Sequence, residues 1–352
     1  MGETMKHVSI NGRLIGEDQP PFVVAEISAN HNGSIKNALN LISAAKDAGA
    51  DAVKLQTYTP DTLTIKSNKP DFIIKGGIWD KYSLYELYKE AHTPFEWHEE
   101  LFDHARELGI TCFSSPFDET AVDLLEDLNT PAYKIASFEI IDLPLIKYVA
   151  QTGKPMIIST GLANVNEIQE AIDTARENGC TDLILLHCIS SYPAPIAESN
   201  LKIIPDMANR FSVVSGLSDH TLGITASISA VALGACFIEK HFIDSRKNIG
   251  PDSSFSLEPE ELSDLCRYAK EAWQSLGSIN YERKKSENEN SGFRRSIYFI
   301  ADASVGDRID KTIIRSVRPG FGLPPKFYDK IIGRRLIRNV EKGDPVTWDD
   351  ID

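Results

Sequence analysis

Residues 232–242 read ALGACFIEKHF, and this stretch indicates the architecture of the whole chain. An apolar run leads directly into Glu239, Lys240 and His241, and apolar sequence resumes at Phe242. Ionisable side chains at the end of such a run are costly to bury unless they are paired, bind a metal or face a polar cavity. The stretch therefore predicts a buried strand whose charged end points into a shared polar cavity.

Seven earlier runs have the same character. They read FVVAEIS (22–28), AVKLQTY (52–58), TCFSSPF (111–117), AYKIAS (132–137), PMIIST (155–160), LILLHC (183–188) and VVSGLSDH (213–220). Continuous apolar runs of this kind are typical of parallel strands that are buried on both faces. The segments between them have apolar residues at helical spacing, and two of these begin at the capping residues Ser34 and Asn164.

Eight strand–helix pairs in about 275 residues predict an α/β fold, the (β/α)8 TIM barrel, whose usual size is about 250 residues. A doubly wound open sheet is the alternative, but no G-x-G-x-x-G motif follows the first strand. The polar segment 277–293 reads as a linker. We therefore expect a barrel domain at 1–276, a linker at 277–293 and a small domain at 294–352.

Polar residues gather where the apolar runs end. They are Glu26, Lys54, Gln56, Ser115, Lys134, Ser137, Glu139, Ser159, Ser190, Ser218, Asp219, His220, Glu239 and His241. One serine at a strand end is usually a cap or turn residue, and one histidine is usually structural. The carboxyl ends of barrel strands meet on one face, where active sites of this fold lie, so the recurrence at eight strand ends indicates an active site.

The residue types at these ends suggest a chemistry. His220 and His241 end neighbouring strands and suit a divalent cation, with Glu239 as a direct or water-mediated third ligand. Two histidines without a nearby cysteine predict an open site for Mn, Mg or Co. Lys54 and Lys134, inside apolar strands, would bind a phosphorylated anion together with the serines.

Composition limits the classes of partner. The net charge of −14 disfavours nucleic acid. No apolar run approaches the length of a membrane helix, so no membrane partner is expected. Five scattered cysteines, none in a C-x-x-C motif, predict reduced thiols in a cytoplasmic protein.

Several motifs resemble the sialic acid synthase family. The matching stretches are VVAEISANHNG, AGADAVKLQTY, YKIASFE, ISTG, YPAP, GLSDHT, IEKHF and GPDSSFSLEPEE, and they occur in order over nearly the whole chain. The insertion TYTPDTLTIKSNKPDFIIKGGIWDK, followed by LYELYKEAHTPFEWH, is more similar to the pseudaminic acid branch than to the N-acetylneuraminate branch.

The resemblance implies a condensation of phosphoenolpyruvate with an N-acetylated amino-sugar aldehyde, with release of phosphate. In the pseudaminic branch the sugar is 2,4-diacetamido-2,4,6-trideoxy-L-altrose; the N-acetylneuraminate and legionaminic acid reactions are the alternatives. By resemblance, the metal ligands are His220 and His241, the catalytic residues are Glu26, Glu139 and His241, and the substrate-binding residues are Lys54, Gln56, Ser115, Lys134, Ser137, Ser159, Ser190, Tyr192, Ser218, Asp252 and Arg318. Members of the N-acetylneuraminate branch often carry Asn in place of Ser190.

Residues 294–352 resemble the antifreeze-like (SAF) domain that ends these synthases. The resemblance implies a domain-swapped homodimer in which Arg318 contacts the sugar at the partner's barrel mouth. The long apolar and aromatic connection 59–93 is expected to form a sugar-side wall or a partner surface, with simple packing on the barrel as the alternative.

Two other functions are compatible with the residues alone. One is a Schiff-base aldolase that uses Lys134 on the same barrel. The other is a non-catalytic carbohydrate-binding or ice-binding protein, which only the C-terminal domain suggests.

Overall fold

The structure is a computed structural model, and it describes residues 6–76 and 79–352. The chain divides into two compact units, Met1–Gly277 and Ser278–Asp352. Each unit is described by itself.

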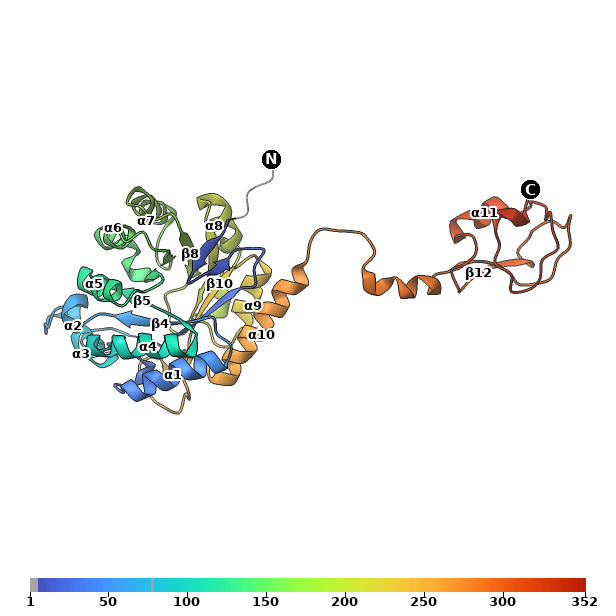
Figure 1. Ribbon diagram of the computed structural model, residues 1–352. Coiled ribbons are helices and arrows are strands. Elements are labelled where there is room, and N and C mark those ends of the chain that lie inside the picture. Colours follow the sequence, from blue (N-terminus) through green and yellow to red (C-terminus); the bar gives the residue numbers. More distant parts are fainter. Residues whose placement is uncertain (1–5, 77–78) are drawn as a thin grey trace. The chain divides into compact units, whose positions relative to one another are not determined.

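The first unit contains the predicted barrel. Its parallel strands close in the order β10-β3-β4-β5-β6-β7-β8-β9 (Figure 1). They are β3 (Phe22–Glu26), β4 (Ala52–Thr57), β5 (Thr111–Pro116), β6 (Tyr133–Ile135), β7 (Met156–Ser159), β8 (Leu183–Cys188), β9 (Val214–Asp219) and β10 (Phe237–His241). Each of the eight predicted runs contains one of these strands, so the (β/α)8 fold is confirmed.

A helix layer surrounds the strands. It consists of α1 (Ile35–Asp47), α4 (His98–Leu108), α5 (Glu119–Asp127), α6 (Leu143–Ala150), α7 (Val165–Glu177), α8 (Ile203–Phe211), α9 (Thr225–Ala232) and α10 (Pro259–Leu276). The oxygens of Ser34 and Asn164 cap α1 and α7 as predicted. None of the helices within the described ranges combines the length and the hydrophobicity that crossing a membrane requires.

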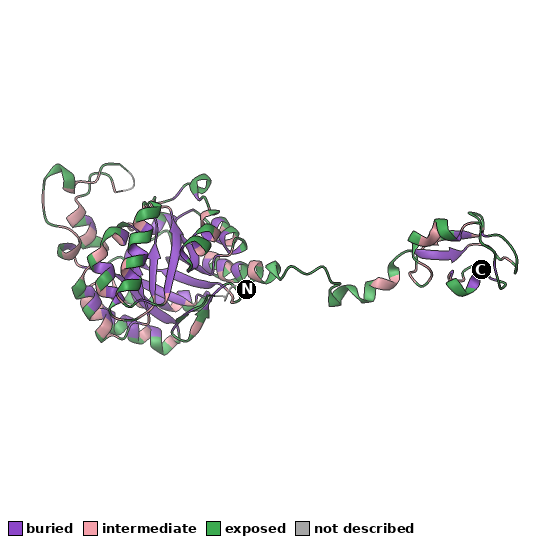
Figure 2. Ribbon diagram, turned by 90° about the horizontal axis from the view of Figure 1, so that it is seen from above, coloured by how far each residue is buried: buried purple, intermediate pink, exposed green. Residues whose placement is uncertain are grey.

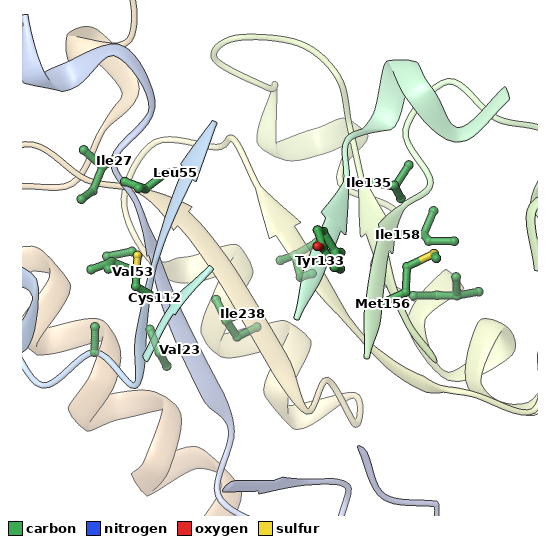
Figure 3. Packing of buried hydrophobic residues seen from close by; sticks show 14 of the residues in the cluster. Val23, Ile27, Val53, Leu55, Cys112, Tyr133, Ile135, Met156, Ile158 and Ile238 are labelled. Carbon is green, nitrogen blue, oxygen red and sulfur yellow. The ribbon is translucent and has the colours of Figure 1, made fainter. Parts of the chain in front are cut away.

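Alternation along each strand divides the apolar residues into two sets. Val23, Val53 and Ile238 belong to the layer between the strands and the helices (Figure 3). Phe22 and Phe237 fill the barrel interior at the amino-terminal ends of the strands. The strands are buried, whereas the helices expose their outer faces (Figure 2).

A hairpin closes the amino-terminal end of the barrel. Its strands are β1 (Val8–Ile10) and β2 (Arg13–Ile15), which pair antiparallel. Val8, Ile10 and Ile15 are buried in the same apolar cluster as Phe22 and Phe237. The hairpin thus completes the core at one end and leaves the polar residues at the other.

The connection 59–93 contains two short helices, α2 (Pro60–Leu63) and α3 (Leu84–Ala91). Between these two helices, an isolated antiparallel β-bridge pairs Ile73 with Ser83. Residues 77–78 of the predicted wall lie outside the described residues.

The second unit contains the antiparallel strands β11 (Ser296–Phe299) and β12 (Ile314–Val317) and the short helix α11 (Tyr328–Ile331). It has its own apolar core, which includes Ile297, Phe299, Ile314, Leu336 and Val346. This core makes the unit compact despite its small size.

Candidate active site

The register of the barrel brings the polar strand ends side by side. The pairs across neighbouring strands include His241 with Glu26, Glu26 with Lys54, Gln56 with Ser115, Cys188 with Ser218 and Ser218 with Glu239. Parallel strands place these residues at one end of the barrel, opposite the hairpin. The shared rim predicted from the sequence is therefore present.

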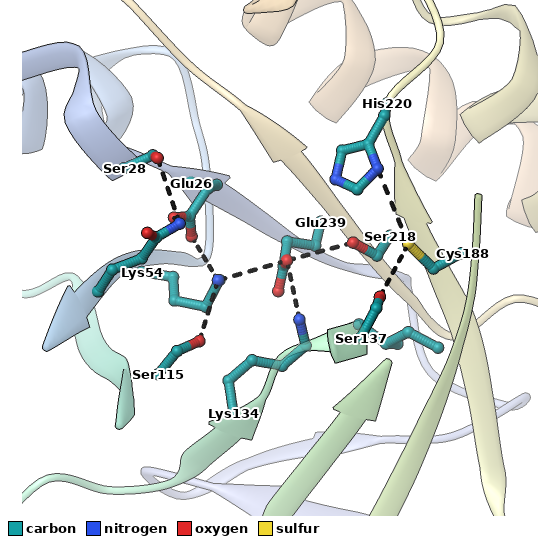
Figure 4. A network of polar contacts seen from close by, with 12 residues as sticks. Glu26, Ser28, Lys54, Ser115, Lys134, Ser137, Cys188, Ser218, His220 and Glu239 are labelled. Carbon is teal, nitrogen blue, oxygen red and sulfur yellow. Dashed lines mark hydrogen bonds and ion pairs between the residues drawn. The ribbon is translucent and has the colours of Figure 1, made fainter. Parts of the chain in front are cut away.

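Two lysines converge on one carboxylate oxygen at the centre of this rim (Figure 4). Nζ of Lys134 lies 3.0 Å, and Nζ of Lys54 lies 3.5 Å, from Oε1 of Glu239. Lys54 also lies 2.7 Å from Oε2 of Glu26 and donates to Oγ of Ser115 at 3.2 Å. Both ammonium groups thus point at a position that an anionic oxygen already occupies.

Burial and the lysines set the protonation of the two carboxyls. Burial opposes the ionisation of Glu239, but Lys134 and Lys54 hold its pKa well below its usual value, at about 2. Burial raises the pKa of Glu26 to about 7, against the attraction of the Lys54 ammonium. Glu239 is therefore a permanent anion, whereas Glu26 exchanges its proton near neutral pH.

One prediction about the stretch 239–241 is wrong, and another stays a prediction. Glu239 is engaged by both lysines and by Ser218, and its role as a direct or water-mediated third ligand stays a prediction. Lys240 does not reach the shared cavity, because side chains alternate along a strand. It pairs with Asp219 at 2.9 Å on the helix side.

The two imidazoles lie together at the ends of β9 and β10. Their ring centroids are 5.4 Å apart, a separation from which both can reach one ion through bonds of about 2.1 Å. Nδ1 of His220 lies 2.9 Å from the carbonyl oxygen of Ile189. A carbonyl only accepts, so this nitrogen carries the hydrogen, and the neutral ring offers Nε2 to a ligand. Burial opposes the charged form of His220, but Cys188 raises the pKa of this ring above its usual value.

His241 is also in the form that binds a metal. Burial, reinforced by the nearby His220, holds the pKa of His241 well below its usual value, so its ring is neutral. Its Nδ1 is buried without a hydrogen-bond partner among the described residues. The donor set therefore fits a divalent cation bound by two imidazoles, with the remaining positions open to substrate or water.

Asp252 connects the two imidazoles to polar residues at the ends of β3 and β4. Its Oδ2 lies 3.8 Å from Nδ1 of His241 and accepts a short hydrogen bond from Ser28. Gln56 donates to Ser28 at 3.2 Å and to Glu26 at 3.0 Å. Sequence reasoning missed Ser28, whose φ of 47° and burial set it apart only in three dimensions.

A cluster of small polar side chains follows β6 to β8. Ser137 donates to Sγ of Cys188 at 3.3 Å, and Cys188 lies 3.9 Å from Oγ of Ser190. A Cβ at Gly161 would lie 2.2 Å from Oγ of Ser190, so only glycine leaves room for this cluster. Oγ of Ser159 is buried without a partner among the described residues. The sequence predicted Cys188 only as a reduced thiol and did not place it in the site.

A cavity of about 740 Å³ opens beside the imidazoles. Its polar lining includes Gln56, Glu139, Ser190, Tyr192 and Asp252. The connection 59–93 supplies an apolar part of the wall, which contains Leu63, Ile74, Trp79, Leu84, Leu87 and Tyr88. This connection thus contributes to the cavity and does not only pack on the barrel.

Tyr192 and Glu139 occupy distinct parts of the cavity. The ring of Tyr192 packs against His220, with centroids 4.3 Å apart, and against Trp79, with centroids 5.7 Å apart. Burial raises the pKa of Glu139 to about 7. Its Oε2 has no hydrogen-bond partner among the described residues and is available to a ligand.

All the predicted site residues except Arg318 lie at this end of the barrel. Arg318 is exposed and belongs to the second unit. Its contact with the sugar remains a prediction.

Comparison with known proteins identifies the family of the chain. A model described as the NeuB family matches residues 41–281. The chain belongs to the NeuB family. A SAF domain model matches residues 294–352, which confirms the predicted nature of the second domain.

Relatives within the NeuB family carry synthase names. A pseudaminic acid synthase of Campylobacter jejuni is 44% identical over 95% of this chain and 97% of its own. An N,N'-diacetyllegionaminic acid synthase of Legionella pneumophila is 38% identical over the full length of both chains. The crystal structure of an N-acetylneuraminic acid synthetase of Leptospira borgpetersenii, in complex with citrate, has a TM-score of 0.74 at 30% identity and covers 82% of this chain and 96% of its own. The prediction of a carbon–carbon bond-forming synthase is confirmed over the non-catalytic alternative.

Proposed function

We propose that this chain catalyses the pseudaminic acid synthase reaction. In that reaction phosphoenolpyruvate condenses with 2,4-diacetamido-2,4,6-trideoxy-L-altrose and water, and phosphate is released. The observation that carries the reaction type is the convergence of two buried lysines beside a pair of imidazoles. The choice of sugar is supported by the 44% identity to the Campylobacter jejuni relative, against 38% to the legionaminic one.

The lysines and serines would hold phosphoenolpyruvate. Lys54 and Lys134 offer positive charge, and Ser115, Ser137, Ser159 and Ser218 offer hydroxyl groups in the same buried region. The unpartnered oxygen of Ser159 supports this role, because a buried hydroxyl without a partner is costly in the free protein. Fixed donors around the phosphate would stabilise the charge that develops as it leaves.

The sugar would lie in the cavity beside the imidazoles. Gln56, Tyr192 and Asp252 would contact its polar groups, and Ser190 would lie at the border with the phosphate. The apolar wall of the connection 59–93 favours a sugar with a methyl group at carbon 6 over one with a hydroxymethyl group, since a hydroxyl placed there would lose its hydrogen bonds to water.

A divalent cation, Mn, Mg or Co, is proposed at His220 and His241. When bound there, it would act as a Lewis acid on the aldehyde oxygen of the sugar. Asp252, 3.8 Å from His241, is placed to orient that ring.

The reaction forms one carbon–carbon bond and breaks one carbon–oxygen bond. Carbon 3 of phosphoenolpyruvate joins the aldehyde carbon, whose oxygen takes a proton and becomes a hydroxyl. Water adds to carbon 2, and one of its protons balances the proton taken by the new hydroxyl. The phosphate then leaves with the electrons of its bond to carbon 2 and takes up the second proton of water, and carbon 2 becomes a ketone. Glu26 and Glu139 would hold these protons, because each has a pKa of about 7.

Glu139 is the better placed of the two to accept the proton of water. It lines the cavity and keeps one oxygen unpartnered, whereas Glu26 is bound by Lys54 and Gln56. We therefore assign the proton of water to Glu139 and the proton of the sugar hydroxyl to Glu26.

The assembly and location of the protein belong to the same proposal. A domain-swapped homodimer would bring Arg318 of one subunit to the cavity of the other. Phosphoenolpyruvate is a cytoplasmic metabolite, and buried free cysteines suit that compartment.

Phosphate release tests the proposed function. The full chain is mixed with phosphoenolpyruvate and a panel of hexosamines that includes the trideoxy-altrose, N-acetylmannosamine and the legionaminic precursor. We expect release with the trideoxy-altrose, and loss of release when EDTA is added and recovery with Mn²⁺. Release with N-acetylmannosamine alone would overturn the choice of sugar.

Borohydride separates the remaining rival. An aldolase that forms a Schiff base at Lys134 would be trapped covalently when borohydride is added with a carbonyl substrate. We expect no adduct, because Nζ of Lys134 is buried and donates to Glu239 at 3.0 Å. An adduct on Lys134 would contradict the synthase assignment.

A further inference from the structure

Lys240 and Asp219 form a buried ion pair that the proposed chemistry does not use. Nζ of Lys240 lies 2.9 Å from Oδ2 of Asp219, and the two residues expose 1% and 3% of their surface. Ser227 of α9 donates to the same Asp219 oxygen at 2.6 Å. The pair therefore lies between the barrel wall and the helix layer, away from the cavity.

The position of the pair relates it to both imidazoles. Asp219 and Lys240 are direct partners across β9 and β10. His220 follows Asp219, and His241 follows Lys240. The ion pair thus joins the two strands at the residues that immediately precede the two rings.

Both members also fix the backbone on the far side of His220. Oδ1 of Asp219 accepts the N–H of Thr221 at 2.8 Å, and Nζ of Lys240 donates to the carbonyl oxygen of Thr221. His220 is consequently held between two anchored positions, while its ring is fixed by the carbonyl of Ile189. An apolar pair of similar size would satisfy neither the N–H nor the carbonyl of Thr221.

We propose that Lys240 and Asp219 are a positioning pair that sets the spacing and orientation of His220 and His241. The inference rests on the proposed function, in which these rings hold a cation. A pair that merely closed the barrel between β9 and β10 would affect stability and leave the rings unchanged. The two roles therefore make different predictions.

The double variant Lys240→Met/Asp219→Leu separates them. Replacing both members of a buried pair by apolar residues avoids an unpaired buried charge. The N–H and the carbonyl of Thr221 lose their partners, however, which lowers the stability of the variant. The tether to Thr221 is lost with them. We expect the dissociation constant for Mn²⁺, measured by electron paramagnetic resonance on the metal-stripped full chain, to rise about 10–100-fold, the range for loss of a residue that orients a metal ligand.

Lys154→Met is the matched control. Lys154 forms an ion pair with Glu126 at 2.7 Å and lies two residues before β7, at the amino-terminal end of that strand, whereas the imidazoles lie at the carboxyl ends of β9 and β10. We expect its Mn²⁺ affinity to equal that of the wild type. Lys240→Met/Asp219→Asn keeps an acceptor for Thr221 and leaves no buried charge unpaired, so it gives a smaller loss and replaces the first double variant if that one does not fold.

A second readout makes the test independent of metal binding. The nuclear magnetic resonance signals of the His220 and His241 rings are recorded in the metal-free protein. We expect them to move in the Lys240 and Asp219 variants and to stay in place in Lys154→Met. A wild type that binds no Mn²⁺ would refute the cation site; unmoved ring signals in a folded variant, or unchanged Mn²⁺ affinity, would refute the positioning role.

Discussion

Replacing Glu239 by Gln probes the centre of the site. The substitution keeps the size of the side chain and removes the negative charge that lies 3.0 Å from Lys134 and 3.5 Å from Lys54. Removing one partner of a buried ion pair costs about 3–5 kcal/mol, because the remaining charge stays buried. The amide oxygen of Gln still accepts a hydrogen bond, so we expect about 3 kcal/mol, the lower end.

This loss of unfolding free energy corresponds to a decrease in the melting temperature, Tm. A folded unit the size of Met1–Gly277 has an unfolding entropy of about 0.6 kcal/mol per kelvin, so a loss of about 3 kcal/mol lowers its Tm by about 5 °C. Inorganic phosphate should restore part of the loss, since it supplies the missing negative charge to the two lysines. We expect phosphate to raise the Tm of the variant by more than it raises that of the wild type.

Circular dichroism melts with and without phosphate provide the assay. Glu126→Gln, which weakens the partly exposed pair with Lys154, is the control and should cost less than about 1 kcal/mol and show no added response to phosphate. A Glu239→Gln variant with an unchanged Tm, or with no greater response to phosphate than the wild type, would show that the lysines do not form an anion site.

Three further outcomes follow from the same geometry. His241→Ala should leave the circular dichroism spectrum unchanged and lower turnover by more than about 100-fold, because loss of a residue that only orients a metal ligand already costs about 10–100-fold. Full activity of this variant would disprove the cation site. The kcat/KM of the wild type should fall as the pH drops through about 7, because a proton acceptor must be ionised and Glu139 gains its proton there. The pH profile of Glu139→Gln should lack this fall. A fall that persists in the variant would assign it to another group. Gly161→Ala should raise the KM for phosphoenolpyruvate about tenfold at nearly unchanged Tm, because its Cβ would displace Ser190 and Ser137, which lie 2.2 and 2.8 Å away; an unchanged KM would place the phosphate elsewhere.

Sequence periodicity was sufficient for the barrel and for the set of residues at its rim. Parallel strands buried on both faces have continuous apolar runs, and even β6 (Tyr133–Ile135), with three residues, lies within such a run. The hairpin β1–β2 was missed, although Asn11-Gly12, with φ of 50° and 79°, is a strong signal for a two-residue hairpin turn.

The partners of the charged residues could not be predicted in the same way. Glu239 takes its lysines from β4 and β6, which are more than 100 residues away in sequence, and only the closed register brings them within reach. The direction of Lys240 was within reach of the sequence, because the middle one of three strand residues faces away from its neighbours. The prediction used only the charge of Glu239, Lys240 and His241 and therefore placed all three side chains in the shared cavity.

The hairpin at the amino-terminal end has a consequence for the order of events. Val8, Ile10 and Ile15 fill that end of the barrel, and in the part of the chain that the structure describes the cavity opens beside the segment 59–93. The lysines lie deeper than the residues that line this mouth. Under the proposed function, phosphoenolpyruvate would therefore bind before the sugar, and phosphate would leave after the new acid.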